Sequence, residues 1–249
     1  MRALSSNDVL RIWEAAEGRG HVERGLVMLR EARPDLAEDA CCDLTIGQRD
    51  AHLLDLHMTT FGRPFSCVAI CPECSERLEV EFTADDVHAS ASGGADRDGA
   101  NSNEGVVRWE DYEVAFRVPT SRDLLHARTR RSVPEARGVL LSRCVSAARA
   151  GVACDPATLP EELTTRVADR MRVADPQADV RVELSCPDCS HAWTADFDVV
   201  SYLWTEIRAT ASRLIREVHE LASRYGWSED AILALSHVRR QMYLDWGGA

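Results

Sequence analysis

The sequence predicts an α+β fold that is mostly helical and includes a small zinc-ribbon-like β element. Helical patterns, with apolar residues at steps of three and four, occupy both ends of the chain. Two Cys-Pro-x-Cys turns, at 71–74 and 186–189, each stand between an apolar segment and an alternating one. Alternation of apolar and polar residues indicates a half-buried strand. Each turn is therefore expected to form a hairpin, and the two hairpins to form the ribbon.

The two cysteine turns predict one structural Zn2+ per chain. Each turn points two thiolates at one metal, and a closed zinc site takes four ligands in a tetrahedron. The predicted ligands are Cys71, Cys74, Cys186 and Cys189. Two alternatives remain open: each turn could share its zinc ion with a dimer mate, or Cys67 could replace one thiolate. His191 is interpreted as a strand residue at the ribbon edge, because four cysteines already close the site.

A redox role for the cysteine pairs is disfavoured by the segments that follow them. A thioredoxin-type pair precedes a helix, whose amino end lowers the thiol pKa. A strand pattern follows both pairs here. The chain opens without an apolar stretch of signal length, and spaced cysteines in a reducing compartment favour zinc over disulfides. The pairs are therefore interpreted as structural.

Composition excludes several classes of function. The 249 residues carry a formal net charge of -12, which disfavours a general affinity for nucleic acid or anionic membrane. No apolar run approaches the length that spans a bilayer. All 29 basic side chains are arginine, so no mechanism can use a catalytic lysine. The sequence has neither a Gly-x-Ser-x-Gly motif nor a glycine-rich phosphate loop. These observations predict a protein that is not an enzyme.

Residues 1–66 are expected to form a helical region of three short amphipathic helices. Asn7 or Asp8 can cap the first helix, and the second stops before Pro34. The third begins at Thr45 and ends near Gly62. Helices this short need a partner surface to be stable.

A first knuckle hairpin at 67–83 is followed by a segment without large apolar residues. Small and polar residues dominate 84–105, which predicts an exposed, flexible linker. A second kind of hairpin, without cysteines, is expected around Glu110-Asp111 at the start of 106–178.

Three helices complete the region 106–178 that is inserted between the knuckles. Thr120 begins the first, and Asp123 three residues later imitates a capping box. The second follows Pro134 and includes Val145, and the third follows Pro160.

The second knuckle hairpin is expected at 179–197, and the carboxyl-terminal helices at 198–249. Apolar residues recur over 200–225 as one stripe of about seven turns, roughly 40 Å long. Asp198 can cap this helix, and Gly226 lies where a left-handed stop is expected. Two short helices follow it. We interpret this carboxyl-terminal region as the element that faces a partner.

The order of these motifs resembles baseplate hub assembly proteins of contractile-tailed phages and phage-tail-like contractile injection systems. The similarity covers most of the chain except the predicted linker. Besides the two knuckles, it is carried by the segments at 116–125, 197–206, 217–222, 225–235 and 239–244.

The resemblance implies a non-enzymatic structural or assembly protein of a phage-tail-like particle baseplate. Its partners would be other baseplate, hub or tail proteins, with no small-molecule substrate, nucleic acid or membrane. It would be cytoplasmic during assembly, and it could stay in the finished particle or leave it. The family has no catalytic residues to carry over, and only the knuckle cysteines transfer.

A second interpretation stays open: the chain could be a zinc-ribbon protein that binds nucleic acid or has a regulatory role. Arg239 and Arg240, near a pair of short helices, imitate a helix-turn-helix. The acidic charge around them argues against this interpretation.

Overall fold

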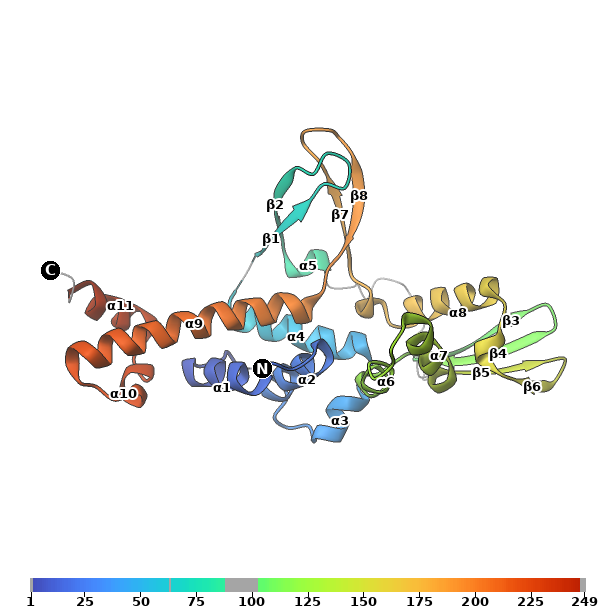
Figure 1. The fold of residues 1–249 in the computed structure, drawn as a ribbon, viewed down its shortest axis with the longest axis horizontal. Coiled ribbons are helices and arrows are strands. Elements are labelled where there is room, and N and C mark those ends of the chain that lie inside the picture. Colours follow the sequence, from blue (N-terminus) through green and yellow to red (C-terminus); the bar gives the residue numbers. More distant parts are fainter. Residues whose placement is uncertain (1, 63, 88–102, 247–249) are drawn as a thin grey trace.

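A computed structural model describes residues 2–62, 64–87 and 103–246, and the α+β class expected from the sequence is confirmed. The molecule is elongated and has three parts (Figure 1). A helical body lies in the middle, two hairpins project together from it, and a lobe with a four-stranded sheet lies at one end. The last two helices lie at the opposite end.

The helical body is built around its longest helix, which runs along its length (Figure 1). Its helices are α1 (Ser6–Ala16), α2 (His21–Ala32), α3 (Glu38–Asp43), α4 (Ile46–Thr60) and α9 (Val199–Tyr225). The apolar stripe of α9 packs against α1, α2 and α4, and Leu203, Ile207 and Ala211 are fully buried. Burial of this stripe stabilises neighbouring helices that are too short to persist alone. No helix in the described part of the chain is both long and apolar enough to cross a membrane.

The ends of α4 and α9 follow the local signals of the sequence. Thr45 caps α4 in a capping box with Gln48. Asp198 caps α9, because its carboxylate accepts hydrogen bonds from the backbone N–H groups of Val200 and Ser201. Gly226 ends α9 in the left-handed region, with a φ of 69°.

The start of α1 differs from the prediction. Ser5 occupies the cap position instead of Asn7 or Asp8, and Asp8 completes the capping box three residues later. The Asp8 carboxylate also pairs with Arg2 and Arg11. It lies in the first turn of α1, where the helix dipole favours an acid.

The lobe consists of an antiparallel sheet with strand order β3-β4-β5-β6, packed against α8. Its strands are β3 (Glu104–Trp109), β4 (Tyr112–Arg117), β5 (Val145–Arg149) and β6 (Val152–Cys154). Its helices are α6 (Ser121–Ala127), α7 (Val133–Cys144) and α8 (Glu161–Ala174), with 3-10 turns at Pro156–Thr158 and Pro176–Ala178. Val114 of β4 and Leu163 of α8 are fully buried in a core separate from that of the helical body.

The sheet has two strands that the sequence pattern did not predict. The pattern places Val145 in the helix after Pro134, but that helix ends at Cys144 and Val145 begins β5. The reason is non-local, because Val145 pairs with Phe116 of β4. A two-residue turn, Ala150-Gly151 with φ values of 48° and 80°, then returns the chain into β6. Only Gly151 matches the preference of such turns, which is for Asn-Gly or Asp-Gly, so the local signal for this hairpin is weak.

The range expected as a linker, 84–105, begins and ends in regular structure. It contains the short helix α5 (Ala84–Val87) and the first residues of β3. The rest of the range, 88–102, lies outside the described residues.

The carboxyl-terminal helices α10 (Glu229–Leu233) and α11 (His237–Trp246) fold back on α9. Glu217 of α9 and Arg240 of α11 form a buried ion pair with an Nε–Oε2 distance of 2.7 Å. Gln241 donates a second hydrogen bond to the same carboxylate. This pairing fixes which side of α11 faces the body, because an unpaired buried charge is costly.

The buried carboxylate of Asp123 connects three elements of the lobe. Asp123 of α6 accepts a bidentate pair of bonds from Arg117, at 2.6 and 3.0 Å, and a third bond from Arg143 at 2.8 Å. The backbone N–H of Thr120 also donates to it, so the predicted capping box is present. Desolvation opposes ionisation, but the hydrogen bonds from Arg117, Thr120 and Arg143 hold the pKa of Asp123 well below its usual range. The carboxylate thereby links β4, α6 and α7.

Replacing Asp123 by alanine is expected to destabilise the protein by about 3 kcal/mol, because it removes a helix cap and the shared partner of two arginines. Chemical denaturation measures the loss. The matched control is Asp43→Ala, which removes an exposed Arg122 partner and is expected to cost less than about 1 kcal/mol. Equal losses in the two variants would contradict this account.

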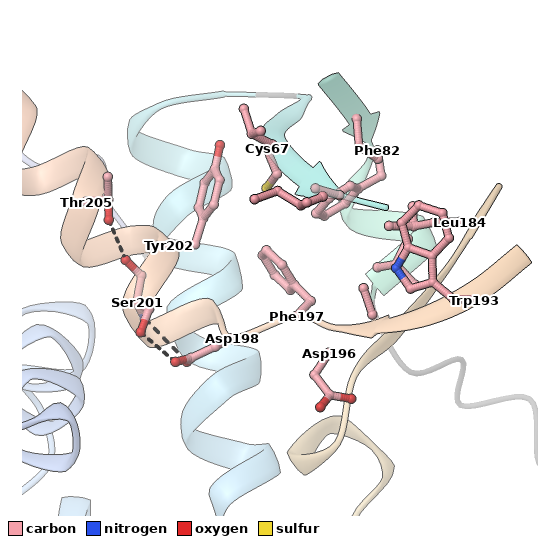
Figure 2. Close-up of a pocket in the computed structure, with 16 residues that line it drawn as sticks. Cys67, Phe82, Leu184, Trp193, Asp196, Phe197, Asp198, Ser201, Tyr202 and Thr205 are labelled. Atoms are coloured by element: carbon pink, nitrogen blue, oxygen red, sulfur yellow. Dashed lines mark hydrogen bonds between the residues drawn. The ribbon is translucent and has the colours of Figure 1, made fainter. Parts of the chain in front are cut away.

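The two projecting hairpins stand on an aromatic junction with the helical body. They are β1 (Phe65–Ile70) with β2 (Arg77–Phe82), and β7 (Arg181–Ser185) with β8 (Ala192–Asp196). Phe65 and Phe82 stack at the base of the first hairpin. Phe197, at the end of the second hairpin, meets Phe82 edge-on; Figure 2 labels both of these residues. His57 of α4 stacks on Phe65, with ring centroids 4.3 Å apart. The junction fixes both hairpins to α4 and α9.

His57 makes this junction sensitive to pH. Burial lowers the pKa of His57 to about 4, since the charged ring would lose its water. The unfolded chain binds a proton near pH 6.5, so it holds more protons than the folded chain between the two values. Stability is therefore expected to fall, by up to about 3 kcal/mol, as pH drops from 6.5 to 4.

Denaturation midpoints measured across this pH range test the prediction. His57→Phe should flatten that part of the profile, while a variant of the exposed His126 should leave it unchanged. A profile that His57→Phe does not alter would refute the role of this ring.

Candidate metal centre

The two Cys-Pro-x-Cys turns fold in the same way, although more than 100 residues separate them. In the first, the N–H of Cys71 donates to the carbonyl of Glu76, and Ser75 N–H donates to Cys71. In the second, Cys186 N–H donates to the carbonyl of His191, and Ser190 N–H donates to Cys186.

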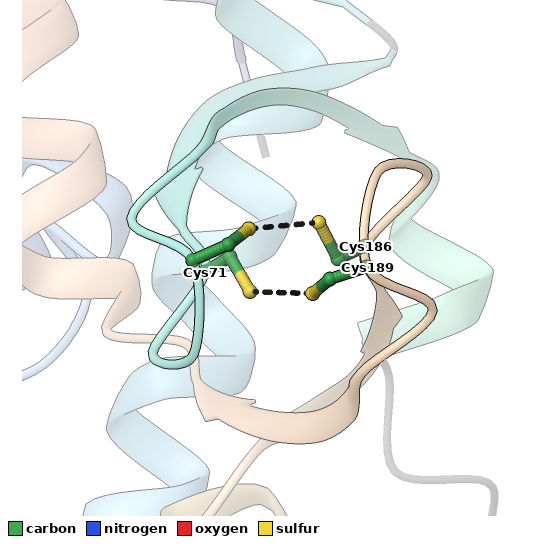
Figure 3. Close-up of side chains that lie close together, drawn as sticks. Cys71, Cys186 and Cys189 are labelled. Carbon is green, nitrogen blue, oxygen red and sulfur yellow. Dashed lines mark hydrogen bonds between the residues drawn. The ribbon is translucent and has the colours of Figure 1, made fainter.

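Each turn closes with a serine in the left-handed region. The φ values are 62° at Ser75 and 58° at Ser190. This conformation is uncommon for a residue with a Cβ, and it turns the chain sharply after the second cysteine. Both cysteines of a turn therefore face the same side, toward the other hairpin (Figure 3).

The tips of the hairpins bring four sulfur atoms together (Figure 3). The Sγ atoms of Cys71 and Cys189 are 3.6 Å apart, and those of Cys74 and Cys186 are 3.5 Å apart. All four lie within 4.8 Å of one another. A tetrahedral zinc with Zn–S bonds of 2.3 Å separates its sulfur ligands by about 3.8 Å. The donor set and its spacing therefore fit a metal ion at the centre of the cluster.

The cluster is open on one side. The first cysteine of each turn is buried, with Cys71 1% and Cys186 2% exposed, while Cys74 and Cys189 are exposed. A metal bound here would be covered by the hairpins on one side and reachable by a chelator from the other.

The pKa values of Cys71 and Cys74 are shifted in opposite directions. Desolvation disfavours the Cys71 thiolate, but backbone N–H groups of Cys74 and Glu73 donate to it and lower its pKa to about 6. The N–H of Glu76 favours the Cys74 thiolate, yet desolvation and the neighbouring sulfur atoms outweigh it and raise that pKa to about 12. Four thiolates at this distance need a cation to balance their charge.

The other candidate ligands lie outside the four-sulfur cluster. Cys67 is on β1, where it lines a groove at the foot of the hairpins (Figure 2). His191 stacks on Trp193, with ring centroids 6.1 Å apart. Since both turns of one chain face each other, the fold assembles four candidate ligands without a dimer mate.

The sequence was compared with models of known protein families. A model described as T4 bacteriophage base plate protein matches residues 28–204. The chain belongs to this family. The matched range covers both cysteine turns, the whole lobe and the first turns of α9. The match confirms the baseplate family that the order of motifs indicated. The four cysteines and Asp123 lie within the matched range.

Comparisons with curated proteins and with solved structures find no match.

The purified baseplate-family protein is expected to carry about one equivalent of zinc. Cys186→Ser should lose most of the metal and lower the unfolding temperature, because metal binding is coupled to folding. Elemental analysis and thiol titration with and without chelator measure both effects.

The control is Cys154→Ser, which removes a thiol of β6 and should keep the zinc. Less than half an equivalent of any metal in the unaltered protein, with all thiols titrating freely, would refute the metal site.

Proposed function

We propose that this chain is a non-enzymatic structural or assembly component in the baseplate of a contractile phage-tail-like particle, and that it acts through protein–protein contacts. The observation that carries the proposal is the family match over 28–204, which spans both hairpins and the lobe. Hub and tail proteins are the proposed partners, and assembly in the cytoplasm precedes any place in the finished particle.

The proposal includes one structural zinc that closes the two hairpins into a ribbon. Cys71, Cys74, Cys186 and Cys189 would hold it. Four cysteine ligands leave no coordination position for water or substrate, so such an ion supplies folding energy and not catalysis. The lobe is inserted between the two knuckles, and the ion would therefore hold the ends of this insertion together.

Two features of the surface support protein contacts. The molecule is elongated, with the hairpins, the lobe and α11 offering separate surfaces (Figure 1). On α11, Val238, Met242 and Trp246 are spaced by four residues and are 68%, 47% and 68% exposed. Apolar side chains at that spacing share one face of a helix. The apolar stripe of α9 is buried in the body from Val200 to Leu214, so among the carboxyl-terminal helices this face of α11 is the stronger candidate for a contact.

The alternative of a zinc ribbon that binds nucleic acid has less support. The hairpin segments 65–82 and 179–197 each carry four acidic side chains and one arginine. A phosphate backbone would be repelled by this surface, since binding of nucleic acid depends on basic contacts.

Deletion of the gene in cells that produce the particle is expected to leave sheath and tube proteins without complete baseplates, as seen by electron microscopy. The wild-type gene and Cys154→Ser should restore assembly, and Cys186→Ser should not. Normal numbers of intact, contractile particles in the deletion strain would overturn the proposed function.

A further inference from the structure

A groove of about 440 Å3 lies at the foot of the hairpins, where both of them meet α9 (Figure 2). The first hairpin lines it with Cys67 and Phe82, the second with Leu184 and Trp193, and α9 with Tyr202 and Thr205. A groove of this volume is in the range that holds a small ligand or several side chains of a peptide.

The facing sides of the hairpins produce this groove. Along β2 and β8 every second residue points inward, which places Val80, Trp193 and Ala195 on the groove side. The outer sides carry the charged residues, such as Glu79 and Glu81. The cysteine turns bring the far ends of the hairpins together. The inward residues Phe82, Val80 and Val182 reach the core of the helical body, and the groove opens beside them between the two hairpins.

The groove has an apolar wall that extends to solvent. Val68 and Ile70 of β1, which also line it, are 49% and 67% exposed. Large aliphatic side chains at this exposure add apolar surface at the rim of the groove, and such surface gains free energy when a partner covers it.

Among the residues that the structure describes, the charged ones that line the groove are two aspartates, Asp196 and Asp198. Asp198 is engaged by His21 and by the amino end of α9. The Asp196 side chain is 85% exposed, and its nearest partner in the described structure, Arg181, is 3.6 Å away. Among the described lining residues there is no arginine or histidine. The groove therefore offers apolar contact with an exposed carboxylate at its rim, where the only basic neighbour that the described residues provide is the half-exposed Arg181.

We propose that this groove binds a short apolar segment of another tail or baseplate protein, and that an arginine or lysine in this segment pairs with Asp196. The inference rests on the proposed function, because it takes the partner from the same particle. Charge complementarity selects the cation, and the apolar walls supply most of the affinity.

Charge also argues against other occupants. A second copy would bring its own acidic hairpins against these, and the whole chain carries a net charge of -12. The segment at 88–102 of this chain contains no large apolar side chain that could fill the groove. A segment of another protein with both apolar and basic side chains can cover the apolar walls of the groove and pair with the Asp196 carboxylate.

Photocrosslinking in cells that express the complete gene cluster tests the proposal. p-Benzoylphenylalanine replaces Thr205, an exposed groove residue on α9, or Val173, an exposed residue of α8 outside the groove. Position 205 is expected to crosslink one segment of a tail or baseplate protein that is apolar and contains arginine or lysine, and position 173 is not.

A synthetic peptide of the crosslinked segment then gives the affinity, by fluorescence polarisation with the full zinc-loaded chain. Asp196→Arg should raise its Kd about tenfold, because attraction becomes repulsion, and higher salt should weaken binding to the unaltered chain. The matched control is Asp245→Arg, which makes the same charge change at an exposed residue of α11. Zinc content checks that both variants are folded.

The inference is overturned by a crosslink from position 205 to a second copy of this chain, by a crosslinked segment without arginine or lysine, or by equal affinity of the peptide for the Asp196→Arg and Asp245→Arg variants. If the chain enters baseplates but position 205 gives no crosslink, the inference fails and the proposed function stands. If the segment comes from a protein unrelated to the particle and binds as described, the groove chemistry stands, the partner class is wrong, and the proposed function loses its support.

Discussion

The meeting of the two hairpin tips at four sulfur atoms is the contact on which the rest of the structure depends. It joins residues more than 100 positions apart, and it closes the chain into a loop that contains the entire sheet-containing lobe. Bringing the ends of so long a loop together costs conformational entropy, which the contacts at the tips must offset. A bound metal would make the constraint conditional on the ion, because thiolates at 3.5–3.6 Å from one another are stable together only around a cation.

A second, metal-independent contact holds the opposite ends of the hairpins. The stacked rings of His57, Phe65 and Phe82, with Phe197 set against them, anchor both hairpins in the core of the helical body. The hairpins are thus fixed at the foot by aromatic packing, and they meet at the tip through the four sulfur atoms. Two-stranded hairpins are marginal by themselves, and this double attachment explains how they can project from the body.

The same arrangement relates the fold to assembly. The groove lies between the facing hairpins, which meet at their tips and rest on the helical body at their feet. The lobe has its own core and its own charged centre at Asp123, so it can present a surface that is independent of the groove. An elongated chain with separated surfaces suits the proposed role in a baseplate.

The sequence by itself determined the features whose causes are local. The cysteine turns, the caps at Thr45 and Asp198, the stop at Gly226 and the long stripe of α9 each depend on residues within one or two turns of one another. Only the tertiary structure decided the features that need distant partners. Val145 becomes a strand residue because β4 is beside it, Asp123 acquires two arginines from β4 and α7, and the groove forms from strands separated by the whole lobe. The cluster of four cysteines depends on both the sequence and the fold. Their spacing identified them as candidate ligands, but only the tertiary structure places their sulfur atoms within 4.8 Å of one another. That distance depends on how the 111 residues between the two turns bring the chain back to the first turn.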